Sequence, residues 1–482
     1  MNWFITAFLA ALTAVSVMAF GAFLLRAVLL NWAVDRVLAR ALKDPYSENL
    51  WDLVIGMTRI PPTILIELEQ RAEFEKPLER PLGTIRHLPD FAGVAFNPVQ
   101  LIKPPLGPQA PIDLTTVIGT KCQRPLRLEM PILVSGMGFG VALSKPFVVG
   151  LARGATQAGT AYNAGSGPVL DEILQDAKHL ILQYAGGAWS REYDILAQAD
   201  MLEIRYGHAG RAAIGRVIPA AGLPPEARQL MGMSENGQAL LEAPLPGAAT
   251  PAELRQLVPT LRKLISGGPV GVKLFATQDI ERELAVVLEA GVDVIAIDGA
   301  QGGTHAGPPI IADDFGIPTV HALHRTIKFL EGNGARKDVT LIMSGGLRTP
   351  GEFLKVLALG ADAVYVGTAV MMSGTHGQIS KSVPFEPVTQ ICWATGDKAD
   401  TFDSNKGAQT VANFLKACAG ELAEAARALG KQSLKEINRD DLIARDPQTA
   451  AVLGLPPSWL PPKQQGGGSA SRQPPKQPSG SS

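Results

Sequence analysis

The feature that most constrains the fold is a pattern that recurs from Pro131 onward. Short apolar runs end in Gly, Ser or Asn, and an amphipathic stretch follows each run. Apolar runs without polar alternation are typical of strands buried on both faces of a sheet. Eight such strand–helix units in about 250 residues predict an α/β fold, a (β/α)8 TIM barrel. The predicted strands are 131–136, 159–165, 179–184, 201–207, 270–275, 292–299, 339–345 and 363–368.

A doubly wound parallel sheet is the alternative fold. Its first strand–helix turn normally carries the spacing GxGxxG. The turn here is Gly136-Met-Gly-Phe-Gly140, which lacks that spacing. The barrel is therefore the predicted fold.

The N-terminus carries an apolar run, residues 4–25, without a single charge. A bilayer core needs about 20 such residues. No Lys or Arg precedes the run, and no convincing cleavage site follows, which argues against a signal peptide. Trp3 and Trp32 flank it as interfacial anchors would, and a buried core helix is the alternative. The basic residues that follow predict a single-pass anchor in the cytoplasmic (inner) membrane with the catalytic domain in the cytoplasm: Arg26, Arg36, Arg40 and Lys43.

The chain is predicted to divide into four segments. Residues 1–43 form the transmembrane anchor and a juxtamembrane helix. Residues 44–130, interrupted by prolines, form an extension that wraps the barrel. Residues 131–455 form the barrel with C-terminal helices. Residues 456–482, rich in Pro, Gly, Ser and Gln, form a disordered tail.

Composition excludes several classes of function. The net charge is -1, and no basic block lies outside the juxtamembrane stretch and the tail, so a nucleic-acid partner is not expected. Cys122, Cys392 and Cys418 are too far apart for a CxxC zinc motif or a dense disulfide scaffold. His321 and His324 have a metal-binding spacing but no accompanying carboxylate motif. We read them as a solvated helix face and predict no metal site.

Two glycine-containing loops end the last two predicted strands. The first is Ser344-Gly-Gly-Leu-Arg348, and the second is Gly367-Thr368. Barrels commonly hold a phosphate at these two loops, where backbone N–H groups and a helix N-terminus face the ligand. Arg348 adds a cationic donor. The pair predicts a ligand that bears a phosphate, with glycines used only as turns as the alternative.

Four stretches resemble barrels that bind flavin mononucleotide (FMN), and more narrowly the FMN-binding domain of glutamate synthase. They are PILVSGMGFGVALSK (131–145), AIDGAQGGTHAGP (296–308), LIMSGGLRTPGEFLKVLALGADAVYVGTAVM (341–371) and FDSNKGAQTVANFLKACAGELAEAARALG (402–430). The last is similar to the tail of stand-alone glutamate synthase-like proteins. The resemblance spans roughly residues 85–455.

The resemblance implies a set of cofactor-binding residues. A turn after strand one lines the flavin ring, and Lys273 lies near the N1/O2 edge, where reduced flavin carries negative charge. The full set is Ser135, Gly136, Met137, Asn163, Gln183, Lys273, Gln301, Gly302, Gly303, Ser344, Gly345, Gly346, Arg348, Gly367 and Thr368.

The sequence departs from the family in several places. The glutamate of the family's NTGEG turn is Ser166 here, and GHAGR (207–211) replaces its substrate-contacting GAKPG run. APLPG (243–247) replaces its paired histidines. The triple-cysteine motif is missing and Cys392 stands alone, so no iron–sulfur cluster is expected. The glutaminase domain of full glutamate synthases is not expected either.

Candidate catalytic residues are Lys273 and His305. His305 lies in the glycine turn after strand six, where barrel catalytic groups gather. It is either a general acid or base, or a loop histidine packing on the flavin. Arg205, His208 and Arg211 are candidates for holding a substrate carboxylate, with structural polar roles as the alternative. His376, just beyond strand eight, is a weaker candidate.

These features predict a membrane-anchored FMN-dependent oxidoreductase. It would act on CH–NH2 donors as glutamate synthase does, with hydride transfer between flavin and an imine, amino acid or keto acid. The alternative is a flavin-binding or degenerate barrel that serves as a membrane-bound scaffold. The electron donor, a protein or NAD(P)H, stays open, and a homo-oligomer is compatible with the sequence. Because the dicarboxylate-gripping run is missing, we expect little glutamate from 2-oxoglutarate and glutamine.

Overall fold

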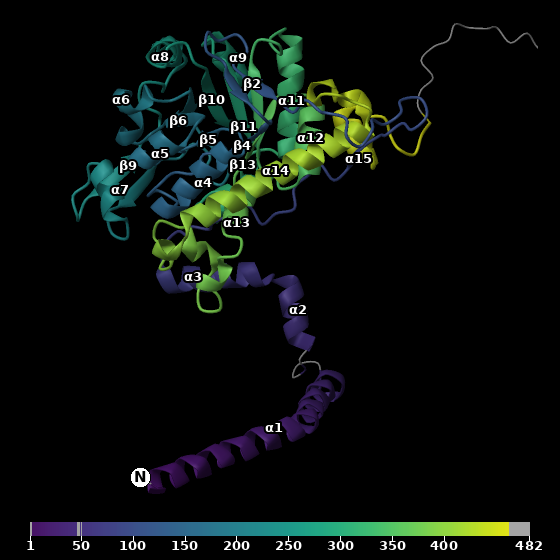
Figure 1. The fold of residues 1–482 in the computed structure, drawn as a ribbon. Helices are drawn as coiled ribbons and strands as arrows, with labels where there is room; N and C mark the ends of the chain where they lie inside the picture. The colour runs from purple at the N-terminus through teal and green to yellow at the C-terminus, as the bar shows by residue number, and fades with distance from the viewer. Residues whose placement is uncertain (1, 46–48, 50, 462–482) are drawn as a thin grey trace, which may run out of the picture. The chain divides into compact units, whose positions relative to one another are not determined.

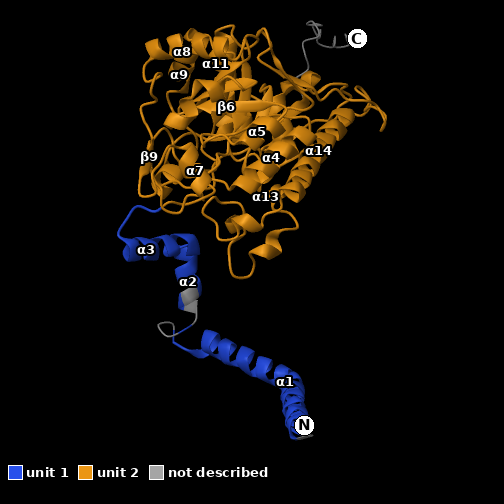
Figure 2. Cartoon of the chain, turned by 60° about the vertical axis from the view of Figure 1, so that its left-hand side comes forward, with its two compact units in different colours: residues 1–78 blue, residues 79–482 orange. Residues whose placement is uncertain are grey.

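The computed structural model describes residues 2–45, 49 and 51–461. The chain divides into two compact units, residues 1–78 and residues 79–482, coloured blue and orange in Figure 2. The second unit contains the whole predicted barrel and the C-terminal helices.

The first unit consists of helices. They are α1 (Asn2–Lys43), α2 (Trp51–Arg59) and α3 (Pro62–Phe74). The stretch Trp3–Lys43 of α1 is long and apolar enough to cross a membrane by length and composition. None of its most apolar 18 residues is buried. The predicted apolar helix is therefore present. That it crosses a membrane stays a prediction.

The second unit is built on eight parallel strands closed into a barrel (Figure 1). Every one of the eight predicted runs forms a strand, and β13 pairs with β4 to close the ring. Closure excludes the doubly wound alternative and confirms the (β/α)8 fold. The strands are β4 (Ile132–Val134), β5 (Tyr162–Asn163), β6 (Leu180–Tyr184), β7 (Met201–Arg205), β10 (Val270–Phe275), β11 (Val294–Asp298), β12 (Thr340–Ser344) and β13 (Ala363–Val366).

Helices cover the outside of the barrel. The amphipathic stretches between the strands place their apolar sides on it, and two helices begin with the capping box that Thr250/Glu253 and Thr349/Glu352 form. The main helices are α4 (Lys145–Gln157), α5 (Asp171–Asp176), α8 (Pro251–Leu264), α9 (Ile280–Glu289), α10 (Pro309–Asp314), α11 (Thr319–Gly332), α12 (Pro350–Ala358), α13 (Thr368–Gly374) and α14 (Ser404–Ala428).

A small hairpin closes the N-terminal end of the barrel. Strands β2 (Thr116–Ile118) and β3 (Leu126–Leu128) pair in antiparallel fashion. Their apolar side chains form one buried cluster with inward-facing strand residues such as Leu133, Ile181 and Ile342. The N-terminal half of the barrel is therefore filled by side chains, which leaves the opposite, C-terminal end for a ligand.

Other segments frame the barrel. Strand β1 (Val94–Phe96) pairs with β14 (Leu442–Ala444), which ties the extension to the C-terminal region. A second hairpin, β8 (Arg216–Pro219) and β9 (Gln238–Leu241), follows β7, and α7 (Pro225–Leu230) lies within its connection.

The segments on either side of the barrel are also described in part. Residues 44–78 group with α1, whereas 79–130 belong to the barrel unit. At the C-terminus, short α15 (Pro447–Leu453) is followed by hydrogen bonds from Ala444 to Pro456 and from Ser458 to Ala444. The ordered chain therefore continues past residue 456, and the rest of the predicted tail, 462–482, lies outside the described residues.

Candidate active site

A cavity of about 540 Å³ lies at the C-terminal ends of the barrel strands. Nearly all of the predicted site residues line it, although they come from seven of the eight strands and their loops. Of the predicted set, only Asn163 is not among the lining residues. Those that line it are Ser135, Gly136, Met137, Gln183, Arg205, His208, Arg211, Lys273, Gln301, Gly302, Gly303, His305, Ser344, Gly345, Gly346, Arg348, Gly367 and Thr368.

The two predicted phosphate loops meet at one side of the cavity. Gly345 has a φ of 118°, and a Cβ there would lie 2.5 Å from Thr319 Oγ1 and 2.8 Å from the Gly299 backbone nitrogen. Only glycine fits this position without strain. Helix α13 begins at Thr368, directly after β13. Arg348 reaches the same cavity, and its backbone N–H donates to Glu352 at 2.7 Å.

The turn after β4 rests on two side-chain amides. A Cβ on Gly136 would lie 2.8 Å from Gln183 Nε2 and 2.9 Å from Asn163 Oδ1. Both amide groups donate to one oxygen of Glu203, Asn163 at 3.0 Å and Gln183 at 2.8 Å. Because a carboxylate oxygen only accepts, the NH2 group of Gln183 must face Glu203. Gln183 lines the cavity, and its carbonyl oxygen is the group left to accept from a ligand.

A cationic layer lies on β7 and β10. Lys273 is buried, and its Nζ is 5.2 Å from the centre of the Tyr365 ring. Arg205 pairs in register with Lys273 and lines the cavity, and its buried Nε has no hydrogen-bond partner among the described residues. Burial lowers the pKa of Arg205 to about 10, while nearby Glu203 opposes the shift. The two cationic side chains together favour an anionic ligand.

His208 and Arg211 lie in the loop after β7. His208 Nδ1 donates to the Ala209 carbonyl at 2.8 Å, and burial together with Arg205 and Lys273 holds the pKa of His208 well below its usual value. Arg211 donates to the Ala306 carbonyl at 2.6 Å and pairs with Glu79 at 3.3 Å. Arg211 therefore holds the wall of the cavity together, while neutral His208 faces it.

His305 stands against an aromatic wall. Its ring meets the Trp393 ring edge-on, with 4.6 Å between the ring centres. The pKa of His305 is lowered to about 4. Burial is the largest cause, and the nearby cations Arg216 and Arg211 lower it further. Its buried Nδ1 has no hydrogen-bond partner in the part of the chain that the structure describes. A neutral imidazole with an open ring nitrogen beside the cavity is suited to exchanging a proton with a ligand.

Gln301 lines the cavity, and its side chain is also engaged within the protein. Its side-chain nitrogen donates to the Pro89 carbonyl at 2.7 Å, and its oxygen accepts from the N–H and hydroxyl of Thr319. The side chain thus pins the glycine turn between the extension and α11.

His87 also lines the cavity, whereas His321, His324 and His376 do not. His321 and His324 are partly buried on α11, and burial lowers the pKa of each, that of His324 to about 4. His376 is exposed beside a shallow apolar groove between α13 and α14. Within residues 2–45, 49 and 51–461, no cluster of three or more His, Cys, Asp or Glu side chains is placed to hold a metal ion.

Sequence reasoning missed three buried residues of the site. Glu203, Tyr365 and Asp298 all point into the barrel. Asp298 accepts from the Ala209 N–H at 3.0 Å, and its second oxygen has no partner within residues 2–45, 49 and 51–461. The sequence carries a signal for Glu203 and Asp298. Each is a charged residue within an otherwise apolar strand, MLEIR and VIAID, and such a residue is costly to bury unless it is paired or functional.

The chain is similar in sequence to glutamate synthases. The model of the conserved region in glutamate synthase matches residues 103–432. A glutamate synthase large subunit-like protein of Rhizobium meliloti is 28% identical over 411 residues, 80% of this chain and 91% of that protein. An archaeal-type glutamate synthase (NADPH) of Thermotoga maritima is 29% identical over 434 residues, 82% of this chain and 83% of that protein.

Two solved structures are also similar. A mutant flavocytochrome b2 with benzoylformate is 15% identical, with a TM-score of 0.46 and coverage of 75% of this chain and 77% of that chain. A mutant (S)-mandelate dehydrogenase is 15% identical, with a TM-score of 0.47 and coverage of 74% and 89%.

Proposed function

Because the chain belongs to the glutamate synthase family, we propose that it is an FMN-dependent oxidoreductase, held at a membrane by α1. The observation that carries the proposal is the convergence of both glycine loops, Lys273 and His305 on one cavity. The family membership confirms the predicted resemblance. Cofactor, substrate and anchoring are what we propose here.

The residues present fit FMN. The backbone at Gly345, Gly346 and Thr368, with Arg348, would hold the phosphate. Lys273 and the carbonyl oxygen of Gln183 would meet the polar edge of the ring. Four buried polar atoms at or below the cavity have no partner within the described part of the chain, and a polar ligand would supply some: Glu203 Oε2, Arg205 Nε, Asp298 Oδ1 and His305 Nδ1.

FMN bound there would supply two-electron hydride transfer. The chain's own residues would set the conditions for it. Lys273 would place positive charge at the cofactor edge that becomes negative on reduction. His305, neutral at physiological pH, would accept or return a proton through its open ring nitrogen. Trp393 would keep water from one side of that imidazole.

For the substrate we propose a small carboxylate that carries an imine, amino or keto group. Arg205, with its open Nε, is the strongest candidate for holding the carboxylate, and His208 is a neutral neighbour. Arg211 is already engaged by Glu79 and Ala306, which supports a role in shaping the wall rather than in holding substrate. We propose NAD(P)H or a reductase protein as the electron donor.

We also propose that the chain works without an iron–sulfur cluster. Cys392 is buried and its thiol donates to the Thr389 carbonyl, and burial raises its pKa to about 12. Burial likewise raises the pKa of Cys122 to about 12 and that of Cys418 to about 11. Thiols with raised pKa values are poor sources of the thiolates that clusters need.

The full chain purified in detergent tests the cofactor. We expect a yellow protein whose visible spectrum bleaches with dithionite. Arg348→Gln should weaken FMN binding about tenfold but leave riboflavin binding unchanged, because riboflavin has no phosphate. A colourless protein that FMN cannot reconstitute would overturn the cofactor assignment.

A second experiment tests the chemistry. The reduced protein is mixed without oxygen with 2-oxo acids, with and without ammonium, and flavin reoxidation is followed. Reoxidation that depends on one substrate supports the oxidoreductase. Uniformly slow reoxidation with FMN tightly bound would instead support the scaffold alternative.

A further inference from the structure

The wall of the cavity mouth has an apolar outer face. Arg216 and Leu241 of the β8–β9 hairpin line the cavity. On the opposite face of the same hairpin, Val217 and Leu240 stand directly across from each other in the strand register, 55% and 50% exposed. Ile214, which also lines the cavity, is 46% exposed. Such a cross-strand apolar pair on a solvent face normally has something to cover it.

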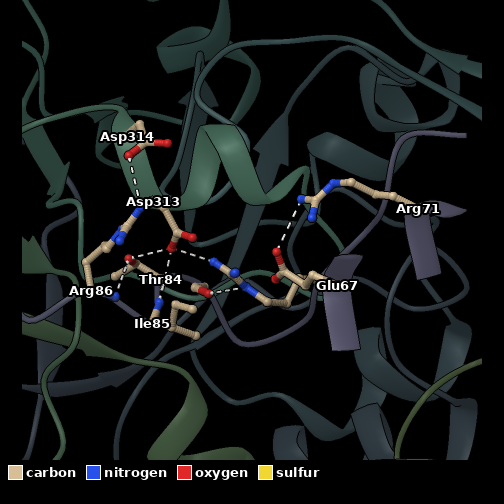
Figure 3. Close-up of polar contacts among 9 residues, drawn as sticks. Glu67, Arg71, Thr84, Ile85, Arg86, Asp313 and Asp314 are labelled. Carbon is tan, nitrogen blue, oxygen red and sulfur yellow. Dashed lines mark hydrogen bonds and ion pairs between the residues drawn. The ribbon is translucent and has the colours of Figure 1, made fainter. Parts of the chain in front are cut away.

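A second part of the mouth is also apolar. Asp313 of α10 accepts hydrogen bonds from Thr84 Oγ1 at 2.8 Å and the Ile85 N–H at 3.1 Å, as Figure 3 shows. This places α10 beside the cavity-lining residues 82 and 84–87. Ile310, at the start of α10, is 64% exposed, and Ile85 is 37% exposed.

A third part is the segment that follows α13. Met371 and Trp393 both line the cavity, and the chain between them projects on the same side of the barrel as β9, away from β2 and α8 (Figure 1). Phe385, within this segment, is 92% exposed and Val383 is 48% exposed. We call these three parts the apolar rim: Ile214, Val217, Leu240, Ile310, Val383 and Phe385.

The polypeptide enters the barrel unit at this rim. Glu79, its first residue, pairs with Arg211 and Arg216, each at 3.3 Å. Leu82 then donates to the Thr304 carbonyl at the cavity. The covalent link to the apolar helix α1 therefore leaves the barrel unit next to the mouth.

We propose that the apolar rim rests on a lipid surface, so that the mouth of the cavity opens at the membrane. The inference builds on the proposed anchoring by α1. A bilayer is favoured over a soluble partner because the apolar groups ring an opening and do not form one continuous patch, and because the tether starts among them. Separate side chains of this kind can each enter the interfacial layer of a membrane, whereas a protein partner needs a continuous complementary face.

Full-length protein in liposomes containing a phospholipid with a photoreactive acyl chain tests the proposal. After illumination, labelled peptides are identified by mass spectrometry. We expect label in α1 and in the peptides that contain Val217 and Phe385. The variant Val217→Asp/Phe385→Asp should show at least fivefold less label in these two peptides, with label in α1 unchanged. Both positions are exposed, so the fold should tolerate the change.

Leu101→Asp is the matched control. Leu101 is 95% exposed on a loop next to the C-terminal end of α14, and it should carry little label in any variant. Label in α1 with none at the rim, or rim label no greater than at Leu101, would overturn the proposal and leave the anchor standing. An unlabelled α1 would overturn the anchor, and the rim peptides would then report on docking independently.

Discussion

Inside the barrel, Glu203 accepts a 2.8 Å hydrogen bond from the side-chain amide of Gln183, one strand away. The carboxylate is wholly buried and also accepts from Asn163 at 3.0 Å. Since it can only accept, it determines which end of Gln183 faces the cavity. Glu203 does not line the cavity, yet it determines that Gln183, which does, presents a hydrogen-bond acceptor there.

Glu203→Gln should weaken FMN binding by about 5- to 150-fold. An amide at this position can turn its own donor toward Gln183, and the mismatch of a buried pair costs about 1–3 kcal/mol. Fluorescence titration of the apoprotein with FMN measures the effect. The double variant Glu203→Gln/Gln183→Glu restores a donor–acceptor pair and keeps an acceptor toward the cavity, so binding should recover. Equal binding by wild type and the single variant would contradict the assigned role.

Gly345→Ala should destabilise the barrel unit by about 1–3 kcal/mol and abolish tight FMN binding. A Cβ there meets backbone as well as the Thr319 hydroxyl, at a φ of 118°, so overpacking and backbone strain add. Gly351→Ala on α12 is the control, because a Cβ there meets no atom within 4 Å. Urea denaturation and FMN titration of both variants provide the comparison. A fully stable Gly345→Ala protein that binds FMN would show that the loop does not need glycine.

Lys273→Met should lower the two-electron midpoint potential of the bound flavin by 30 mV or more. The buried ammonium favours the negatively charged reduced state, and 30 mV corresponds to about 1.4 kcal/mol for two electrons. Lys416→Met, an exposed change on α14, should leave the potential unchanged. Redox titration against a reference dye measures the midpoint potential of the flavin in each variant. An unaltered potential in Lys273→Met would place this cation away from the reacting ring.

Acid should destabilise the protein partly through His305. Its pKa is lowered to about 4 in the folded state, so between pH 6.5 and 4 the unfolded chain binds more protons and stability falls as the pH drops. This residue alone contributes a slope of at most about 1.4 kcal/mol per pH unit. His305→Gln should flatten the decline in denaturation midpoint between pH 7 and pH 5. The denaturation midpoint of His376→Gln, a change at an exposed position, should follow that of wild type. The same slope in all three proteins would show that His305 does not contribute to the pH dependence of stability.

Much of the fold could be predicted before the structure. All eight strands coincide with apolar runs, because a strand covered on both faces leaves no room for polar alternation. The glycine loop after β12 was readable for a similar reason, since a positive φ and close approach at Gly345 and Gly346 leave few other residues possible. The long apolar helix needed only its length and lack of charge.

What the sequence determined by itself was therefore local: the eight strands, the turns that must be glycine, and the apolar helix. The tertiary structure alone decided which side chains meet. Asn163, Gln183, Glu203 and Tyr365 converge only because the barrel closes and every second residue of a strand points inward. Likewise, the side chain of Gln301 donates to the carbonyl of Pro89, 212 residues away in the chain. Hydrogen bonds between residues so distant in sequence leave no periodic trace, because they depend on strand order and register and not on local composition.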